Sequence, residues 1–254
     1  IIMALKTRTE AAGLSFRMRD LAARRAVTTL QRRVRPALNK LRSELLGMLR
    51  NARTDAGVWA LPDGPAFYAA NVRTLGDTAL SPDEIHQIGL DEVARISADM
   101  NALLAKRGMT QGSIGARMLA LAKDPANQFA DNDAGREDLL NYVRARVKDA
   151  EARYAELLPA EMIPRQALLV KRVPIATQAS APGGYYDGPS LDGTRPGTYW
   201  INLRDMAAVA RFRLPTLSYH EGVPGHHTQG SVATAFGEAP MLIRLASFNA
   251  YQEG

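Results

Sequence analysis

The sequence predicts a mostly α-helical protein, built from many helices, with a small β-hairpin or sheet beside a helix that carries a histidine cluster. Two observations predict this class. Apolar residues recur at helical spacing over most of residues 1–158. Strand-like runs occur only in the stretch that follows, just before the histidines. We expect residues 1–254 to form one helical domain, cut from a longer chain at both ends.

Residues 1–53 are predicted to form a basic helical segment, interrupted near Pro36. The segment contains 13 Lys and Arg residues but only three acids, Glu10, Asp20 and Glu44. Such a block can bind nucleic acid or an anionic membrane surface. No recognised nucleic-acid motif accompanies the arginines, so we expect them to pair with acidic partners in the fold and expect no nucleic-acid partner.

Residues 54–158 continue as helix. After a loop rich in Gly and Pro, the run Ser81-Pro82-Asp83-Glu84 is a strong helix start, because Ser81 and Glu84 can form a capping box around a proline in the first turn. We expect this helix to end at Gly108. Two further helices are predicted, a short one over 113–123 and a long one over 135–158.

Residues 159–203 are predicted to be a β insert and loop. Residues 167–173 and 198–203 have strand composition, and 183–198 are expected to form an ordered loop between them. This segment either supports the neighbouring helix as a hairpin or offers an edge strand to an extended peptide. The candidate contacts for such a peptide are Tyr185, Tyr186, Arg195, which can hold a carboxylate at two points, and Asn202.

Composition excludes several classes of protein. The chain has no cysteine, so it has no disulfide framework, thiolate metal site or cysteine nucleophile. No apolar run is long enough for a membrane span, and we expect no transmembrane segment. No secretory signal is visible in residues 1–30.

Residues 204–254 return to helix and carry the chemistry. Three of the four histidines fall within eight residues, in the run His220-Glu221-Gly222-Val223-Pro224-Gly225-His226-His227. In the zinc-peptidase signature H-E-x-x-H, two histidines one helical turn apart hold the metal and the glutamate activates the attacking water. Here the position of the second histidine is Pro224, so the run differs from that signature.

The identity of the second ligand stays open on geometry alone. On a regular helix His227 would share a face with His220, because seven residues make nearly two turns. Pro224 and Gly225 favour a distortion, which would bring His226 to that place instead. A third ligand is also needed. The later acids are Glu238, in a predicted turn, and Glu253, on the next predicted helix; a glutamate on the following helix favours Glu253.

At this point the chain resembles the bacterial domain of unknown function 885 family, over about residues 55–254. The resemblance rests on the helix from Leu80 to Met100, the octapeptide 220–227, and Glu253-Gly254, which is similar to the start of a Glu-Gly-Trp motif. It also rests on a loop-and-strand block that contains Tyr185-Tyr186, Pro189-Ser190, Asp192-Gly193-Thr194-Arg195-Pro196-Gly197 and Asn202.

The resemblance implies a metallopeptidase-like helical fold of the gluzincin kind and one Zn²⁺ per chain. It implies His220, His226 and Glu253 as ligands, with His227 as the alternative, and Glu221 as the catalytic base. The expected activity is peptide hydrolysis, with 204–254 as the active-site helices. The alternatives are a zinc-dependent hydrolase of another amide or ester, and a non-catalytic basic binding domain. For the longer protein we expect a periplasmic or other extracytoplasmic location.

Overall fold

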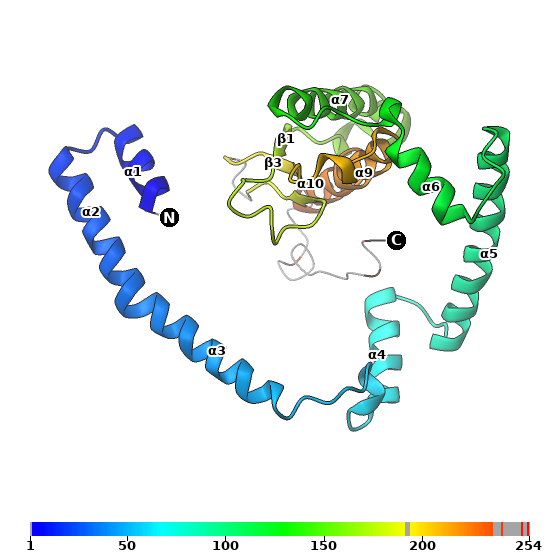
Figure 1. Cartoon of the computed structure of the whole chain (residues 1–254), viewed down its shortest axis with the longest axis horizontal. Coiled ribbons are helices and arrows are strands. Elements are labelled where there is room, and N and C mark those ends of the chain that lie inside the picture. The colour runs from blue at the N-terminus through cyan, green and yellow to red at the C-terminus, as the bar shows by residue number, and fades with distance from the viewer. Residues whose placement is uncertain (1, 191–193, 236–239, 241–249, 251–252, 254) are drawn as a thin grey trace. The chain divides into compact units, whose positions relative to one another are not determined.

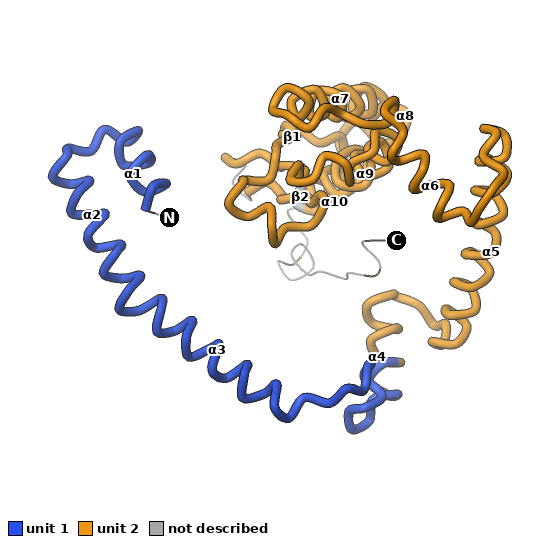
Figure 2. The backbone as a smooth tube through the Cα atoms, in the orientation of Figure 1, with its two compact units in different colours: residues 1–68 blue, residues 69–254 orange. Residues whose placement is uncertain are grey.

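Two units make up the chain, residues 1–68 and residues 69–254, and their boundary falls inside helix α4 (Gly64–Gly76) (Figure 2). The structure is a computed structural model, and it describes residues 2–190, 194–235, 240, 250 and 253. The predicted class, mostly helical with a small sheet, is confirmed. Figure 1 labels the main elements.

The described part of the first unit is mostly helical. It contains α1 (Ile2–Ala11), α2 (Phe16–Thr29), a π-helical turn (Leu30–Val34), α3 (Arg35–Leu49) and a 3₁₀ turn (Val58–Ala60). Pro36 has no N–H to donate, yet the helix runs through it without a break, because Val34 and Arg35 both keep right-handed helical dihedral angles. The predicted interruption near Pro36 takes the form of a π-helical turn between α2 and α3.

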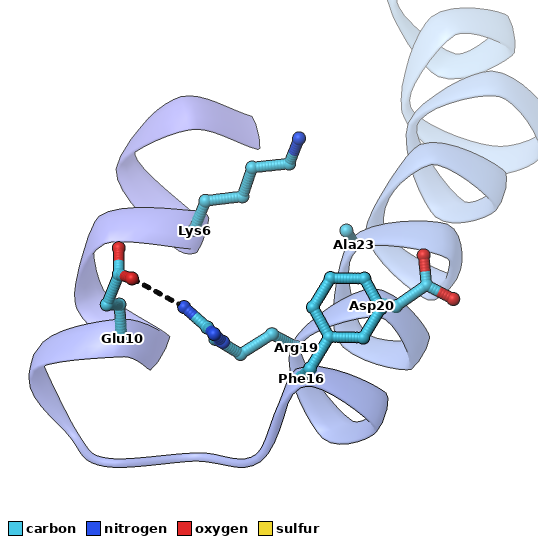
Figure 3. Close-up of a pocket in the computed structure, with 6 residues that line it drawn as sticks. All are labelled: Lys6, Glu10, Phe16, Arg19, Asp20 and Ala23. Atoms are coloured by element: carbon cyan, nitrogen blue, oxygen red, sulfur yellow. Dashed lines mark hydrogen bonds and ion pairs between the residues drawn. The ribbon is translucent and has the colours of Figure 1, made fainter.

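An ion pair joins the first two helices. The Nη1 atom of Arg19 lies 2.7 Å from Oε1 of Glu10, and the two residues border a pocket of about 310 Å³ between α1 and α2 (Figure 3). Phe16 and Lys6 also line this pocket. Because the Glu10 side chain is largely exposed, we expect the pair to contribute about 1 kcal/mol or less.

The helices of the second unit follow the sequence signals closely, with one exception. After α4 come α5 (Pro82–Lys106), α6 (Ile114–Lys123), α7 (Asp133–Glu151), α8 (Tyr154–Leu157) and 3₁₀ turns at Pro125–Asn127 and Ala160–Met162. The capping box of α5 is confirmed, since Ser81 N–H donates to Glu84 Oε2 at 2.7 Å and Glu84 N–H donates to Ser81 Oγ at 3.3 Å. The single helix expected over 135–158 is wrong, because α7 ends at Glu151 and α8 is a separate turn.

Three strands form the sheet in the order β1-β3-β2, with β1 (Leu168–Arg172), β2 (Gly184–Asp187) and β3 (Gly197–Ile201). The central strand β3 runs parallel to β1 and antiparallel to β2, so both β1 and β2 are edge strands. The two predicted strands are confirmed. The expectation that 183–198 is only a loop is wrong, because β2 lies within it.

The core of the second unit lies between α7 and one face of the sheet. In a strand, alternate side chains face the same side. Accordingly Val170 of β1 and Tyr199 and Ile201 of β3 are buried together against the apolar side of α7. The α7 residues in this cluster are Leu139, Leu140, Val143 and Val147.

The chain then returns to helix, through 3₁₀ turns at Met206–Ala208 and Arg211–Arg213, to α9 (Leu214–Glu221) and α10 (His226–Ala235). Leu214 at the start of α9 and Val223 after it belong to the same core. Helix α9 contacts both α7 and β2, so the sheet and α7 together fix its position. None of the described helices is both long and apolar enough to cross a lipid bilayer.

A sharp connection separates α9 from α10. Helical dihedral angles end at Gly222, with φ −106° and ψ −106°, and the Val223–Pro224 peptide bond is cis. The Gly225 N–H donates to the carbonyl of Tyr219 at 2.9 Å, which folds the connection back on the end of α9. A Cβ atom at Gly225 would overlap the carbonyl oxygen of His220, so this approach requires glycine.

We predict that Gly225→Ala destabilises the full-length protein by about 1–3 kcal/mol, because the added methyl group meets backbone that cannot move without shifting α10. A thermal melt followed by circular dichroism measures the change. The matched control is Gly230→Ala, within α10, where the added atom meets only an ordinary contact at 3.8 Å. Equal melting temperatures for the two variants would contradict the role given to Gly225.

Candidate metal centre

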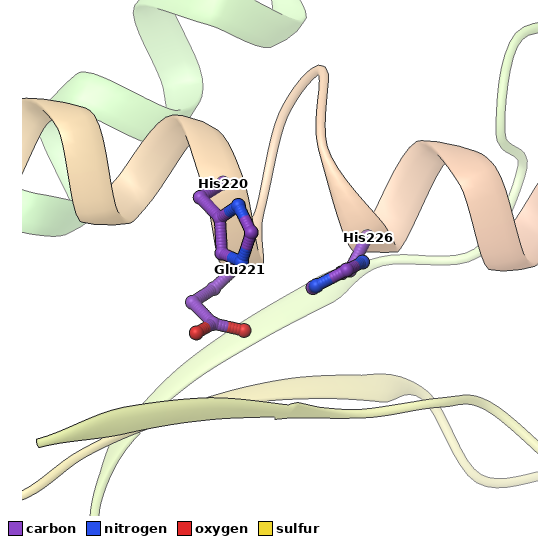
Figure 4. A group of neighbouring side chains, drawn as sticks. All are labelled: His220, Glu221 and His226. Carbon is purple, nitrogen blue, oxygen red and sulfur yellow. The ribbon is translucent and has the colours of Figure 1, made fainter. Parts of the chain in front are cut away.

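The connection between α9 and α10 brings two histidines together. His220 lies in the last turn of α9 and His226 is the first residue of α10. Their ring centroids are 4.5 Å apart, with the ring planes at 70°. Figure 4 shows both imidazoles and the Glu221 carboxylate reaching the same space above the sheet. One ligand atom from each of these three residues lies within 4.8 Å of the others.

The carboxylate of Glu253 completes this group. Its Oε2 atom lies 3.3 Å from Nε2 of His220 and 3.6 Å from Nε2 of His226. The structure therefore brings together His220, His226 and Glu253, the three residues predicted as ligands. Glu238, the other acid considered, lies outside the described residues.

A hydrogen bond orients the His226 ring. Its Nδ1 atom lies 3.2 Å from Oε1 of Gln229, one turn along α10. When the Gln229 amide oxygen accepts this hydrogen bond, Nδ1 is the donor, and a neutral ring then has its lone pair on Nε2. That lone pair is on the side of Glu253. This is the tautomer that a metal ligand needs, and partners of ligating histidines commonly hold the ring in this way.

The glutamate between the two histidines has a different environment. Glu221 is 7% exposed, whereas the side chain of Glu253 is 59% exposed. Burial raises the pKa of the Glu221 carboxyl group, and the neighbouring Glu253 acts in the same direction. His220, His226 and a backbone hydrogen bond from Tyr186 oppose this rise in the pKa. Glu221 is therefore a buried carboxyl group held beside the histidines.

His227 occupies a separate place. It is 1% exposed, and both of its ring nitrogens are engaged within the fold. Its Nδ1 atom lies 3.0 Å from the Tyr186 hydroxyl group and its Nε2 atom lies 3.1 Å from the carbonyl oxygen of Gln166. Burial lowers the pKa of this imidazole. His227 in this arrangement has no nitrogen left for a metal ion.

The residues predicted to contact a peptide lie in three different surroundings. Tyr186 reaches the centre, through its hydroxyl group at His227 and its backbone at Glu221. Tyr185 faces the other side of β2 and stacks on Trp200, with ring centroids 6.3 Å apart. Arg195 is half exposed and pairs with Asp187 at 3.2 Å.

Asn202 anchors a loop in the structure. Its side-chain amide donates to the carbonyl groups of Gln178 at 2.8 Å and Ala181 at 3.1 Å, which holds the turn before β2. These bonds occupy the donor atoms that a substrate would use. Of the predicted peptide contacts, Tyr186 is therefore the one that the structure connects to the candidate metal ligands.

Sequence reasoning missed the residues that support the centre. Gln166 and Gln229 belong to no motif, and Gly197, although part of the loop-and-strand block, was expected only in a turn with Pro196. In the structure, a Cβ atom at Gly197 would lie 2.5 Å from the Tyr186 hydroxyl oxygen and 2.9 Å from Nδ1 of His227. The glycine makes room for that hydrogen bond, which no local pattern predicts.

Comparisons with known proteins agree with the resemblance seen in the sequence. No curated protein matches the chain. The crystal structure of a "putative lipoprotein" from Colwellia psychrerythraea is similar, with a TM-score of 0.94 and 39% sequence identity. The match covers 100% of this chain and 43% of that one, so the chain spans less than half the length of this relative. The family model described as "Bacterial protein of unknown function (DUF885)" matches residues 4–254. This chain therefore belongs to the bacterial DUF885 family of proteins of unknown function.

Proposed function

We propose that this chain carries the metal centre of a zinc-dependent metallopeptidase. The observation that carries the proposal is the convergence of two imidazole Nε2 atoms on one carboxylate, with a second, buried carboxyl group beside them. The residues of this cluster are His220, Glu221, His226 and Glu253. An ordinary ion pair at a protein surface needs only one of the two imidazoles.

The donor atoms fit zinc. Two neutral imidazoles and one carboxylate are the protein ligands of a large class of catalytic zinc sites, in which the fourth position stays open. Calcium and magnesium prefer oxygen ligands alone. In this chain His220, His226 and Glu253 would hold the ion, and Gln229 would keep the Nε2 lone pair of His226 available. A bound zinc ion would polarise the scissile carbonyl group and make water a stronger acid.

Glu221 is the residue that would move the proton. Its carboxylate would accept a proton from the attacking water and later donate it to the leaving amine. A general base works best when its pKa lies near the working pH, and burial shifts the Glu221 pKa in that direction. The Tyr186 backbone hydrogen bond would keep the carboxylate aimed at the site.

The edge strand β2 favours a peptide over another amide or ester. In an antiparallel pair, hydrogen-bonded and non-hydrogen-bonded residue pairs alternate. Asn202 N–H donates to the carbonyl of Gly183, so the same pattern turns the backbone groups of Gly184 and Tyr186 away from β3. An extended peptide adds to such an edge through its own backbone, and here it would use Gly184 and the carbonyl group of Tyr186, since the Tyr186 N–H is bonded to Glu221. The strand lies beside α9, which carries Glu221.

The location of the protein is part of the same proposal. The Colwellia relative is described as a "putative lipoprotein", which supports an extracytoplasmic location for this protein. The first unit is basic, but its helices supply no observation that favours a nucleic-acid-binding function over a hydrolase.

We predict that the full-length protein, purified without chelators, contains about one zinc ion per chain. His220→Ala, His226→Ala and Glu253→Gln should each lower the zinc content, because each removes one converging ligand. Elemental analysis measures this. His86→Ala is the matched control, since His86 is exposed on α5. Absence of any transition metal, together with activity that chelators leave unchanged, would rule out the proposed centre.

We predict that Glu221→Gln retains zinc but loses peptide hydrolysis by about 10²–10⁴-fold, because the amide cannot accept the proton from water. The measurements are zinc content and turnover of a mixed peptide library. Glu161→Gln, at an exposed position on a 3₁₀ turn, is the control and should match the parent. Hydrolysis at the parent rate by Glu221→Gln would show that Glu221 is not the base.

A further inference from the structure

We infer that His227 is a positioning residue, which together with Tyr186 and Gln166 clamps the edge strand β2 against the helix that carries His226. The inference rests on the proposed function, since what the clamp positions is the proposed base and one proposed ligand. It assigns a task to the second histidine of the pair, which the proposed ligand set leaves without one.

The hydrogen bonds of His227 settle its tautomer. The carbonyl oxygen of Gln166 only accepts hydrogen bonds, so Nε2 of His227 must carry a proton to make this 3.1 Å contact. In the neutral ring, Nδ1 then carries a lone pair, and the Tyr186 hydroxyl group must donate to it across 3.0 Å. The two hydrogen bonds therefore run in one direction. The Tyr186 hydroxyl group donates to Nδ1 of His227, and Nε2–H of His227 donates to the carbonyl oxygen of Gln166, so both donors are used.

The surroundings are built to keep this chain of hydrogen bonds in place. His227 is almost fully buried, and the Tyr186 ring meets it edge-on with centroids 5.7 Å apart. Gly197 on the central strand leaves the space that the two polar atoms occupy. Breaking one of these buried hydrogen bonds would leave a polar partner unsatisfied away from water, so the three groups hold one another in place.

Tyr186 connects this clamp to Glu221. Its side chain is tied to α10 through His227, while its backbone N–H is hydrogen-bonded to the carboxylate at the end of α9. One residue of β2 thus contacts the two helices on either side of the sharp connection. If the strand shifts, the base and the His226-bearing helix shift with it, and a displacement of about 1 Å in a catalytic group can cost about 10²-fold in rate.

A second tyrosine provides a matched comparison. The Tyr154 hydroxyl group lies 2.9 Å from Oγ1 of Thr228, the next residue of α10, and this pair is also buried. Both tyrosines therefore bond to the first turn of α10. Only Tyr186 of these two tyrosines also bonds to Glu221 through its backbone. Removing the hydroxyl group of Tyr186 should therefore lower the catalytic rate, whereas removing that of Tyr154 should not.

The first experiment measures the tautomer directly. In the full-length protein labelled with ¹⁵N-histidine, the His227 signals are assigned with His227→Asn and recorded before and after zinc removal. We expect His227 to remain protonated at Nε2 in both states, and Tyr186→Phe to shift its Nδ1 signal. Two results would overturn the inference. One is a change of the His227 signal on zinc removal of the kind that a metal ligand shows, and the other is protonation of His227 at Nδ1 in the parent protein.

The second experiment measures the coupling. Tyr186→Phe should retain zinc and lower kcat about 10-fold with little change in KM, as expected for a group that acts by alignment. His227→Asn should retain more activity than His227→Ala, because its amide can both donate and accept. The double variant Tyr186→Phe/His227→Ala should be no slower than His227→Ala, since both changes break the same hydrogen bond.

Tyr154→Phe should lower the melting temperature to a similar extent but leave kcat near the parent value. Equal losses of kcat in Tyr154→Phe and Tyr186→Phe would reduce His227 to a structural role and overturn the inference. A parent protein that binds zinc at neither His220 nor His226 would instead refute the proposed function. The Nε2 protonation state and the response to Tyr186→Phe still decide whether the clamp exists.

Discussion

The approach of Gly225 to the carbonyl group of His220 is the constraint on which the rest of this centre depends. It allows the chain to leave α9 at Glu221, turn within four residues and begin α10 at His226. A continuous helix would separate these two histidines by more than one and a half turns and place them on different faces. The proline and the glycines of the octapeptide therefore determine where the imidazoles lie, although they contribute no ligand atom.

The sheet supports this arrangement from one side. Helix α7 and the buried face of β1 and β3 form the apolar core, and α9 packs on that core through Leu214. The edge strand β2 then lies beside the end of α9, where its backbone reaches Glu221. Apolar packing thus fixes the distance of α9 from the sheet. Hydrogen bonds fix the orientation of the side chain of Glu221 at the end of α9.

Local signals predicted much of the fold. The capping box at Ser81 and Glu84 is a property of four adjacent residues, and the structure has both of its hydrogen bonds. The distortion expected at Pro224-Gly225 likewise follows from the chemistry of two residues. The strand β2 could not be recognised in this way, because a short segment rich in glycine and tyrosine becomes a strand only when β3 pairs with it.

For the candidate site too, the sequence predicted what depends on neighbouring residues and left open what depends on distant ones. The spacing of the histidines left His226 and His227 as alternatives, and their different surroundings depend on residues far away in the sequence, above all Tyr186 and Gln166. The choice of His226 as ligand remains a prediction. What the structure adds is the physical difference between the two: Nε2 of His226 lies 3.6 Å from the Glu253 carboxylate, whereas both nitrogens of His227 are hydrogen-bonded inside the fold.

The break between α9 and α10 also has an electrostatic consequence. The peptide dipoles of a helix leave partial negative charge at its C-terminal end and partial positive charge at its N-terminal end. His220 stands at the end of α9 and His226 at the beginning of α10, so the break places one helix terminus of each sign next to the same few atoms. The interior of an unbroken helix would offer neither. The last carbonyl groups of α9 favour a cation there, and the first N–H groups of α10 favour negative charge at the same place.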